Sequence, residues 1–373
     1  MKIKSIVIGC AFLLFAACGN NKDLHKATPV PKNVILLISD GTGLTQISSA
    51  FYFKEGTPNY QRFKHIGLIK TSSSREKVTD SAASGTAFAS GVKTYNGAIG
   101  VADDSTSVET IVEIASRKNI STGVVATSSI THATPASFFA HALRRSYAEE
   151  IALDLAESEV DFFAGGGIHY FNKRKDERNL LDELKDKQFL LDTTALGDFA
   201  SIQDQDKVGY LLAPDALSPI AEGRGDFLPD ATALGIQFLN KDETGFFMMA
   251  EGSQIDWGGH DNDADYLVSE LIDFDEAIGK ALDFAEKDGN TLVIVTSDHE
   301  TGGFTLGSQT KTRANGTTYS DYSEIGMKFS TGGHSATLIP VFAYGPGAEK
   351  FAGIYENTEI FHKILQLTNW DKE

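Results

Sequence analysis

The chain alternates between continuous apolar runs and longer amphipathic stretches. Five runs are apolar at most positions and have the length of buried strands: residues 33–40, 121–129, 161–166, 245–252 and 290–300. Continuous apolar runs are typical of parallel strands covered on both faces. Helical patterns lie between them, as in residues 107–119 and 266–290. The alternation predicts a three-layer α/β fold, a doubly wound, largely parallel sheet with helices on both faces.

Acidic residues stand where several of these runs end. Asp40 ends the first run, Glu251 the fourth, and Asp298 with His299 the fifth. Because ligands bind beyond the carboxyl ends of the strands in such sheets, we expect these side chains to converge. A single aspartate there is usually a loop cap. Clustered carboxylates, however, repel and raise one another's pKa unless a cation neutralises them, so the set predicts metal ligands.

Two further segments supply histidines. In EGSQIDWGGH, Asp256 and His260 stand four residues apart, which places both on one face of a helical turn, although the two glycines leave a tight turn open. His334 lies in the glycine-rich segment STGGHSAT, where backbone can approach a site closely. Mixed imidazole and carboxylate ligation indicates zinc rather than calcium.

The segment VTDSAASGTAF, residues 78–88, predicts a helix start with Asp80 or Ser81 as its cap. Capping alone explains most such pairs. The alternative is that Ser81 is a nucleophile at a helix N-terminus, where backbone N–H groups and the dipole favour an anion. A serine hydroxyl needs a base or a metal to activate it, and the local sequence offers no histidine and no Gly-x-Ser-x-Gly pattern.

Composition narrows the classes of partner and of chemistry. The chain has 373 residues, 41% of them hydrophobic, which is ample for a large core. Its formal net charge of −18 argues against a nucleic-acid or anionic-membrane surface. Both cysteines, Cys10 and Cys18, precede the first predicted strand, so cysteine nucleophiles, cysteine metal sites and a disulfide in the folded domain are excluded.

The N-terminus has the pattern of an export signal. Residues 1–17 combine Lys2 and Lys4 with an apolar stretch too short to span a membrane as a helix. The stretch ends in FAACG, which resembles a lipoprotein box with Phe15 where leucine is usual. We expect export to the periplasm, with Cys18 lipidated as an outer-membrane anchor or, alternatively, ordinary signal cleavage. Residues 18–32 then form a polar tether before a domain at 33–370.

Six segments together resemble the alkaline phosphatase family over essentially the whole mature chain: ISDGTG, VTDSAASGTA, HATPASFFAHALRR, EGSQIDWGGH, SDHETGG and GGHSAT. The resemblance implies hydrolysis of phosphate monoesters through a covalent phosphoserine, with two zinc ions and a third metal, usually magnesium. Carried over by motif, it implies zinc ligation by Asp256, His260 and His334, a second zinc at Asp40, Asp298 and His299, and magnesium at Asp40, Thr134 and Glu251.

The same resemblance implies roles for the groups around the phosphate. Ser81 would be the nucleophile and an exchangeable ligand of the second zinc. Arg145, rather than its neighbour Arg144, would clamp the phosphate through two N–H groups, and Asp80 would orient Arg145. The two zinc ions would flank an in-line displacement at phosphorus. Inorganic phosphate would be the product.

Two positions depart from the best-known enterobacterial pattern of the family. His132 stands where that pattern has aspartate, and Trp257 stands where it has lysine. We expect the affinity for the third metal to be weaker or altered, and the release of phosphate to be faster. The alternative for Trp257 is that it packs as a wall residue, since tryptophan often fills space.

Residues 301–333 are expected to form a short insertion, with a β-hairpin turning at Asn315-Gly316. In this family an insertion here forms a crown near the site or a dimer contact, and the resemblance implies a homodimer. Residues 170–230 carry charge runs and are interpreted as a solvated helical surface.

Three rival functions bear on the same residues. A phosphodiesterase of the same superfamily would not need Arg145 for a dianionic monoester end. A sulfatase would need its own oxidised cysteine or serine motif, and the DSAAS segment lacks the proline and arginine that accompany it. A lipoprotein that binds metal or phosphate without turnover would have no use for Ser81 beside a full ligand set.

Overall fold

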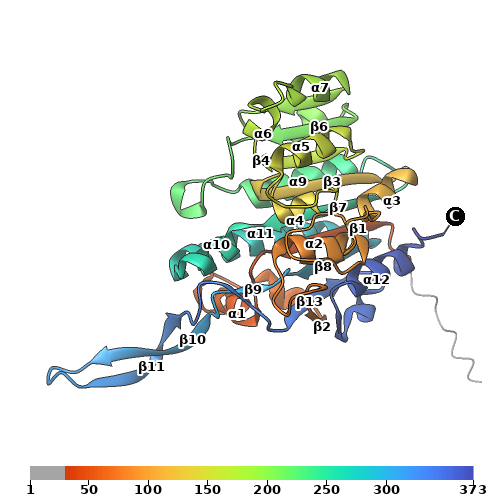
Figure 1. Cartoon of the computed structure of the whole chain (residues 1–373). Helices are drawn as coiled ribbons and strands as arrows, with labels where there is room; N and C mark the ends of the chain where they lie inside the picture. Colours follow the sequence, from red (N-terminus) through yellow and green to blue (C-terminus); the bar gives the residue numbers. More distant parts are fainter. Residues whose placement is uncertain (1–29, 373) are drawn as a thin grey trace, which may run out of the picture.

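The computed structural model describes residues 30–372. Its centre is a ten-stranded sheet in the order β14-β2-β13-β8-β1-β7-β3-β4-β6-β5 (Figure 1). The five predicted runs form five adjacent strands: β8 (Thr291–Thr296), β1 (Asn33–Ser39), β7 (Phe246–Gly252), β3 (Ser121–Ser129) and β4 (Phe162–Gly166). These five pair in parallel. The predicted fold class is confirmed.

Five further strands complete the sheet on both sides. On one side lie β13 (Ile339–Tyr344), β2 (His65–Lys70) and β14 (Gly353–Glu356), and on the other β6 (Lys207–Leu211) and β5 (Phe189–Asp192). Strand β13 is antiparallel to both of its neighbours. The interpretation of residues 170–230 as a helical surface is wrong in part, because β5 and β6 extend the sheet there and β6 is almost wholly buried.

Helices cover both faces, and the residues of β1 show how. Val34, Leu36 and Ile38 face one apolar cluster, whereas Ile35 and Leu37 face the other. The first cluster packs under α2 (Ser81–Ser90), α3 (Ile111–Arg117), α4 (Ala133–Ala136), α5 (Ala148–Glu157), α6 (His169–Asn172), α7 (Leu180–Asp186) and α12 (Glu359–Thr368). The second packs under α1 (Leu44–Phe53), α8 (Phe199–Ile202), α9 (Phe227–Leu239), α10 (Gln254–Asp261) and α11 (Ala264–Asp288).

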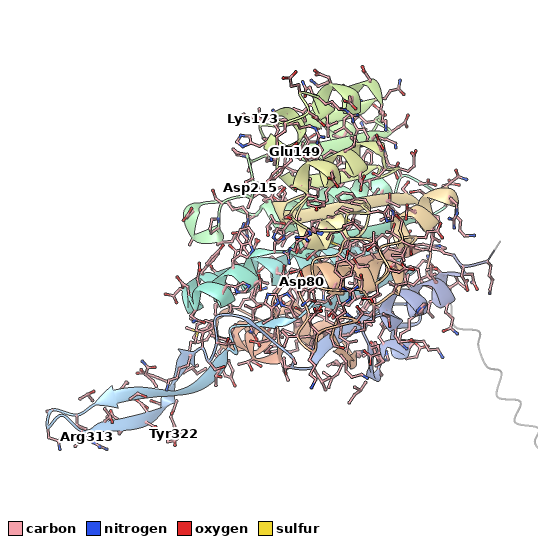
Figure 2. All side chains as sticks on the ribbon, viewed as in Figure 1. Asp80, Glu149, Lys173, Asp215, Arg313 and Tyr322 are labelled. Carbon is pink, nitrogen blue, oxygen red and sulfur yellow. The ribbon has the colours of Figure 1, made fainter. Side chains whose placement is uncertain are left out.

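Residues 301–333 form a hairpin arm rather than a compact crown. Strands β10 (Thr305–Thr312) and β11 (Thr318–Lys328) pair with each other and extend away from the body (Figure 1). The turn contains the predicted Asn315-Gly316 pair, and Gly316 has a φ of 84°. Arg313 and Tyr322 lie out on this arm, far from Asp80 in the body (Figure 2).

Short elements link the arm to the body. Strands β9 (Glu300–Thr301) and β12 (His334–Ser335) pair at its base. Elsewhere in the body, 3-10 turns occur at η1 (Asn59–Arg62), η2 (Ile220–Glu222) and η3 (Ala348–Phe351). Within residues 30–372, no helix has both the length and the apolar character needed to cross a membrane. The predicted leader, Cys18 and residues 19–29 of the tether lie outside the described residues.

Candidate metal and phosphate site

The predicted strand-end carboxylates meet at one edge of the sheet. Asp40 directly follows β1, Glu251 lies near the end of β7, and Asp298 lies two residues after β8. The three strands are adjacent and parallel, so their carboxyl ends are side by side. All three side chains are fully buried. Parallel pairing therefore concentrates negative charge where water cannot screen it.

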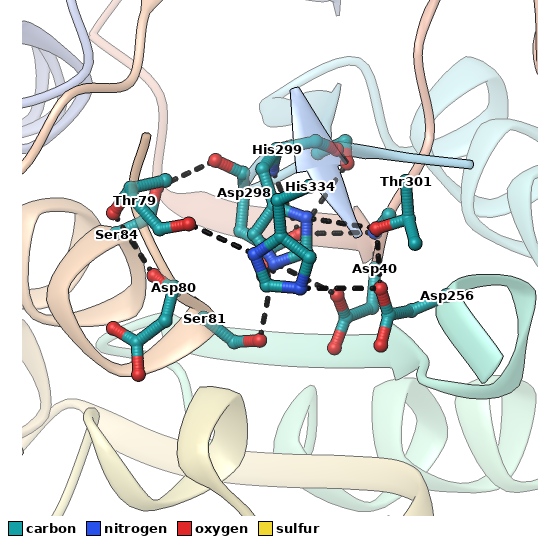
Figure 3. Close-up of polar contacts among 12 residues, drawn as sticks. Asp40, Thr79, Asp80, Ser81, Ser84, Asp256, Asp298, His299, Thr301 and His334 are labelled. Carbon is teal, nitrogen blue, oxygen red and sulfur yellow. Dashed lines mark hydrogen bonds and ion pairs between the residues drawn. The ribbon is translucent and has the colours of Figure 1, made fainter. Parts of the chain in front are cut away.

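His299 joins two of these carboxylates. Its Nε2 lies 3.2 Å from Oδ2 of Asp298 and 3.6 Å from Oδ1 of Asp40 (Figure 3). Its Nδ1 contacts the Thr301 hydroxyl at 3.2 Å. One ligand atom of each of Asp40, Asp298 and His299 lies within 4.8 Å of the others, a spacing that could hold a metal ion. The structure thus brings together the residues expected for a second zinc.

Asp256, His260 and His334 form the next cluster. The two glycines do not interrupt α10, and His260 Nε2 lies 3.4 Å from Asp256 Oδ2. His334 Nε2 lies 3.7 Å from Asp256 Oδ1 and 3.1 Å from His260 Nε2. The Nδ1 atoms of His260 and His334 each contact a backbone carbonyl at 2.8 Å. Because a carbonyl only accepts, each Nδ1 donates its N–H, and each Nε2 faces Asp256 as the ring atom that could bind a metal.

The two clusters adjoin. The rings of His299 and His334 stack with centroids 3.5 Å apart, and Asp256, His299 and His334 also bring ligand atoms within 4.8 Å of one another. His260 is the most open member, with 40% of its side chain exposed. The Nε2 atoms of His260 and His334 lie 3.1 Å apart and converge with the Asp256 carboxylate, so this side of the site could also hold a cation.

A third group surrounds Glu251. Asp40, His132 and Glu251 bring ligand atoms within 4.8 Å of one another. The Thr134 side chain, at the start of α4, is fully buried close to Glu251, and its hydroxyl has no hydrogen bond of good geometry among residues 30–372. The expected set of Asp40, Thr134 and Glu251 thus acquires His132 as a neighbour.

Ser81 is the first residue of α2 and is only 2% exposed. Its Oγ lies 3.2 Å from Nε2 of His299 (Figure 3). Asp80 caps the helix, since its Oδ1 accepts from the backbone N–H of Ala83 at 3.0 Å. The small residues of α2 have a packing reason, because a Cβ built on Gly85 would come within 2.8 Å of the Ser137 hydroxyl. The helix N-terminus is thereby set deep against the metal-ligand cluster.

Arg145 lies beside this N-terminus. Its Nη1 donates to Oδ2 of Asp80 at 3.1 Å, and its Nη2 lies 3.3 Å from Nε2 of His132. Arg144, by contrast, is exposed. Burial, reinforced by the charge of Arg145, lowers the pKa of His132 to about 4. His132 is therefore neutral and accepts from Arg145, and the ring of Trp257 meets it edge-on at 6.0 Å.

The alkaline phosphatase family model matches residues 31–315 and 308–369. The chain belongs to the alkaline phosphatase family. Alkaline phosphatase 3 of Bacillus subtilis is 34% identical, over 91% of this chain and 89% of its own length. The alkaline phosphatase of Escherichia coli is 30% identical, over 89% of this chain and 85% of its own length.

Solved structures agree with this assignment. The alkaline phosphatase of the Antarctic bacterium TAB5 is 67% identical with a TM-score of 0.90, covering 92% of this chain and 99% of that one. A histidine-to-aspartate variant of the TAB5 enzyme, with Mg bound in its M3 site, is 69% identical with a TM-score of 0.91 over the same shares. As an alkaline phosphatase, this protein is a hydrolase of phosphate monoesters.

The charge balance of this alkaline phosphatase site fits bound divalent cations. Both carboxylate oxygens of Asp40, Oδ2 of Asp298 and Oε1 of Glu251 are buried and have no hydrogen-bond partner among the described residues. Burial, then the charges of Asp298, Asp256 and Glu251, raises the pKa of Asp40 well above its usual range. Burial likewise raises the pKa of Glu251 to about 7. Orphaned buried oxygens are costly, and cations would satisfy them.

The sequence analysis did not single out two residues, Thr301 and Glu300, that stand beside the predicted ligands. Thr301 is buried, and its hydroxyl donates to Oδ1 of Asp256 at 2.5 Å while accepting from Nδ1 of His299. Glu300 accepts from the Gln46 side chain and, at 3.1 Å, from the backbone N–H of Phe304. Both lie in the SDHETGG segment, where they follow the ligands Asp298 and His299 directly. That adjacency was their only signal in the sequence.

Proposed function

We propose that this alkaline phosphatase transfers the phosphoryl group of its substrate to Ser81 and then to water. The observation that carries the proposal is the position of the Ser81 Oγ. It is buried at the N-terminus of α2 and lies 3.2 Å from a histidine of the carboxylate cluster. Attack would form a bond between Oγ and phosphorus and break the bond to the leaving alcohol. Water would then release inorganic phosphate and regenerate the hydroxyl.

We further propose three metal sites: zinc at Asp256, His260 and His334, zinc at Asp40, Asp298 and His299, and magnesium at Asp40, Thr134 and Glu251. Bound metal ions would lower the pKa of the Ser81 hydroxyl and of water and would neutralise the carboxylates. The orientation of each imidazole Nε2 toward carboxylate oxygens supports the zinc assignments. The unpartnered oxygens of Thr134 and Glu251 support the third site.

Arg145 and Asp80 would hold the phosphoryl group in place. Arg145 uses one N–H of Nη1 toward Asp80 and one of Nη2 toward His132, and the planar fork leaves further N–H groups for two phosphate oxygens. The negative charge on those oxygens persists through the transition state, so a fixed arginine stabilises it without rearrangement. Asp80, held by the cap of α2, would fix Arg145 relative to Ser81.

His132 and Trp257 are proposed to tune the third site and product release. His132 places a neutral ring where a carboxylate would add charge, and its Nδ1 is buried without a hydrogen-bond partner among residues 30–372. Less negative charge beside Asp40 and Glu251 weakens attraction for magnesium. The edge-on contact with Trp257 supports a link between the two positions.

A competition among substrates tests the proposed function. We expect the metal-loaded protein to hydrolyse an aryl phosphate monoester faster than the matching diester or sulfate ester, and to lose turnover on treatment with a chelator. Faster diester turnover would favour the phosphodiesterase alternative. Metal binding without turnover of any ester would favour a binding lipoprotein.

We also propose that the protein is a homodimer that buries the outer face of α1. Leu44, Phe51, Tyr52 and Phe53 leave 39 to 65% of their surfaces exposed on this one helix. Large exposed apolar side chains that adjoin one another mark an interaction surface. Strand β10 of the hairpin arm packs beside α1, so a second copy of the chain that covered α1 would also contact the arm.

The first described residues enter the sheet at the end remote from the candidate site. The Lys32 N–H donates to the carbonyl of Asn290, the residue before β8, and β1 begins at Asn33. The metal site lies beyond the opposite ends of these strands. We propose that Cys18 anchors the protein to the outer membrane, and recovery of a Cys18→Ala variant in the soluble fraction would test the anchor.

A further inference from the structure

Asn96 bridges the backbone on either side of Thr79, the residue before Asp80. Its side-chain Oδ1 accepts from the Asp80 N–H at 3.1 Å, and its Nδ2 donates to the Val78 carbonyl at 3.0 Å. These two bonds use the amide as a bridge across the turn that leads into α2. The turn itself has an extended Asp80, with φ −106° and ψ 172°, which places the next residue, Ser81, at the start of the helix.

Asp80 has no spare oxygen with which to tolerate a shift. Oδ1 accepts from the Ala83 N–H at 3.0 Å, and Oδ2 accepts from Arg145 Nη1 at 3.1 Å. A small rotation of the Asp80 backbone would therefore break either the helix cap or the contact with Arg145. Asn96 limits that rotation, because it holds the N–H of Asp80 itself and ties it to the Val78 carbonyl two residues earlier.

The residues around Asn96 also hold the backbone of Arg145. The Arg145 N–H donates to the Gly97 carbonyl at 2.7 Å, and the Tyr95 hydroxyl donates to the Leu143 carbonyl at 3.1 Å. Ile99 and Ala142 then exchange two backbone hydrogen bonds, each 2.9 Å long. Gly97 has a φ of 91°, a value that favours glycine. Residues 95–99 thus hold the backbone of residues 142–145, and Asn96 lies in the segment that connects Asp80 with Arg145.

We propose that Asn96 is a positioning residue for the Asp80–Arg145 pair, and through it for binding of the phosphoryl group. Asn96 does not itself reach the phosphate, because its amide oxygen and nitrogen are both engaged with the backbone. It sets the relative position of Ser81, whose helix it helps to start, and of Arg145, whose backbone its neighbour Gly97 holds. The inference rests on the proposed roles of Arg145 and Ser81. It gives a role to Asn96, which takes no part in the steps proposed for Arg145 and Ser81.

Calorimetric titration of the metal-loaded protein with inorganic phosphate tests this inference. For Asn96→Ala we expect the Kd of phosphate to rise about five- to tenfold, the effect of losing one or two hydrogen bonds that hold a binding group. KM for an aryl phosphate should rise more than kcat falls, and zinc content should match the wild type. The matched control is Asn179→Ala, which removes a helix-capping asparagine with two local bonds on the remote helix α7. The control should leave the Kd unchanged.

A double-mutant cycle separates positioning from general stability. In an Arg145→Ala background, Asn96→Ala should weaken phosphate binding less than twofold further, because the group that Asn96 positions is already absent. An unchanged Kd in Asn96→Ala, or an equal loss in both backgrounds, would overturn the inference. Should Asn96→Ala fail to fold, Asn96→Ser enters the same cycle with the same expected signs. If Arg145→Ala alone left phosphate binding intact, the proposed clamp would fail instead, whatever Asn96 did.

Discussion

At the scale of residues, the orientation of three histidines is set by what their Nδ1 atoms contact. His260 and His334 use backbone carbonyls, whereas His299 uses the hydroxyl of Thr301. Since a carboxylate only accepts, Thr301 must donate to Asp256, and its oxygen then accepts from His299. One hydroxyl therefore orients a ligand of each proposed zinc site.

Replacing Thr301 by valine should weaken both proposed zinc sites. Valine keeps the shape of the side chain but removes the hydroxyl, so His299 and Asp256 each lose an orienting bond. We expect zinc affinity to fall about tenfold or more, as for other losses of groups that support metal ligands. Competition with a chromophoric chelator measures this. Thr301→Ser, which keeps the hydroxyl, is the control, and equal affinity in the valine variant would contradict the bridging role.

The convergence of the strand-end carboxylates could be predicted from the sequence, but the residues that contact them could not. Asp40, Glu251 and Asp298 follow buried runs, and parallel pairing alone brings such positions together. Thr301 contacts Asp256 only once the chain has folded. Asn96 likewise meets Asp80, which lies elsewhere in the chain. A threonine and an asparagine carry no pattern that reports such a distance. Only the resemblance to a family had assigned Arg145 and Thr134 their roles.

At the scale of elements, His141 connects α3 to the segment that carries Arg145. Its Nδ1 contacts the Gly100 carbonyl at 2.6 Å and its Nε2 contacts Glu113 at 3.0 Å. The hydrogen bond to Glu113 raises the pKa of His141, against the opposing effect of burial. Burial by itself would raise the pKa of Glu113. Hydrogen bonds from His141 and from the N–H of Thr110 outweigh burial and lower the pKa of Glu113 below its usual value. The pair thus favours a charged state in the fold.

The stability that this pair contributes should depend on pH. Because the folded pKa of His141 is raised, its contribution is full below the unfolded value of about 6.5 and is lost as pH rises through the folded value. We expect His141→Gln to lower the free energy of unfolding by up to about 1 kcal/mol near pH 6, and by less at alkaline pH. Thermal unfolding across a pH series measures the difference. His362→Gln, at an exposed position on α12, should show no such trend, and a constant deficit in His141→Gln would contradict the ionic account.

Which strands could be predicted depended on their place in the sheet. The five central strands are buried on both faces and therefore read as continuous apolar runs. Strand β14 is exposed along half its length, and β6 offers only a short apolar run after Lys207. Strand β13 is buried but contains Pro340, which argues against a strand inside a sheet. Pattern alone therefore finds the sheet's centre and misses its flanks.

At the scale of the whole molecule, the outer face of α1 and the hairpin arm are both exposed among residues 30–372. The outer face of α1 exposes Tyr52 over 65% of its surface, and β11 carries Tyr322, which is 89% exposed. Tyr322 lies where β11 passes from its pairing of Asp321 with Gln309 to that of Ile325 with Ser308. A two-stranded arm with so little burial has few stabilising contacts of its own, so association with a second chain would stabilise it.

An arginine introduced on α1 should dissociate the proposed dimer. Tyr52→Arg places a charge at the most exposed apolar position of the helix, so the subunits should separate at concentrations where the wild type is dimeric. Light scattering after size-exclusion chromatography reports the mass directly. Ile354→Arg changes an equally exposed residue on the edge strand β14 and should stay dimeric. A monomeric wild type, or a dimer that survives Tyr52→Arg, would contradict the proposed interface.

The fold buries the Ser81 hydroxyl between the N-terminus of α2 and the cluster of proposed metal ligands. The most direct test of this account is mass spectrometry of the metal-loaded protein after acid quenching during turnover of an aryl phosphate. We predict one phosphoryl group on the peptide that contains Ser81. We also predict none in Ser81→Ala, which should retain its metals and its fold. A phosphoryl group on another residue, or undiminished turnover in Ser81→Ala, would contradict the account.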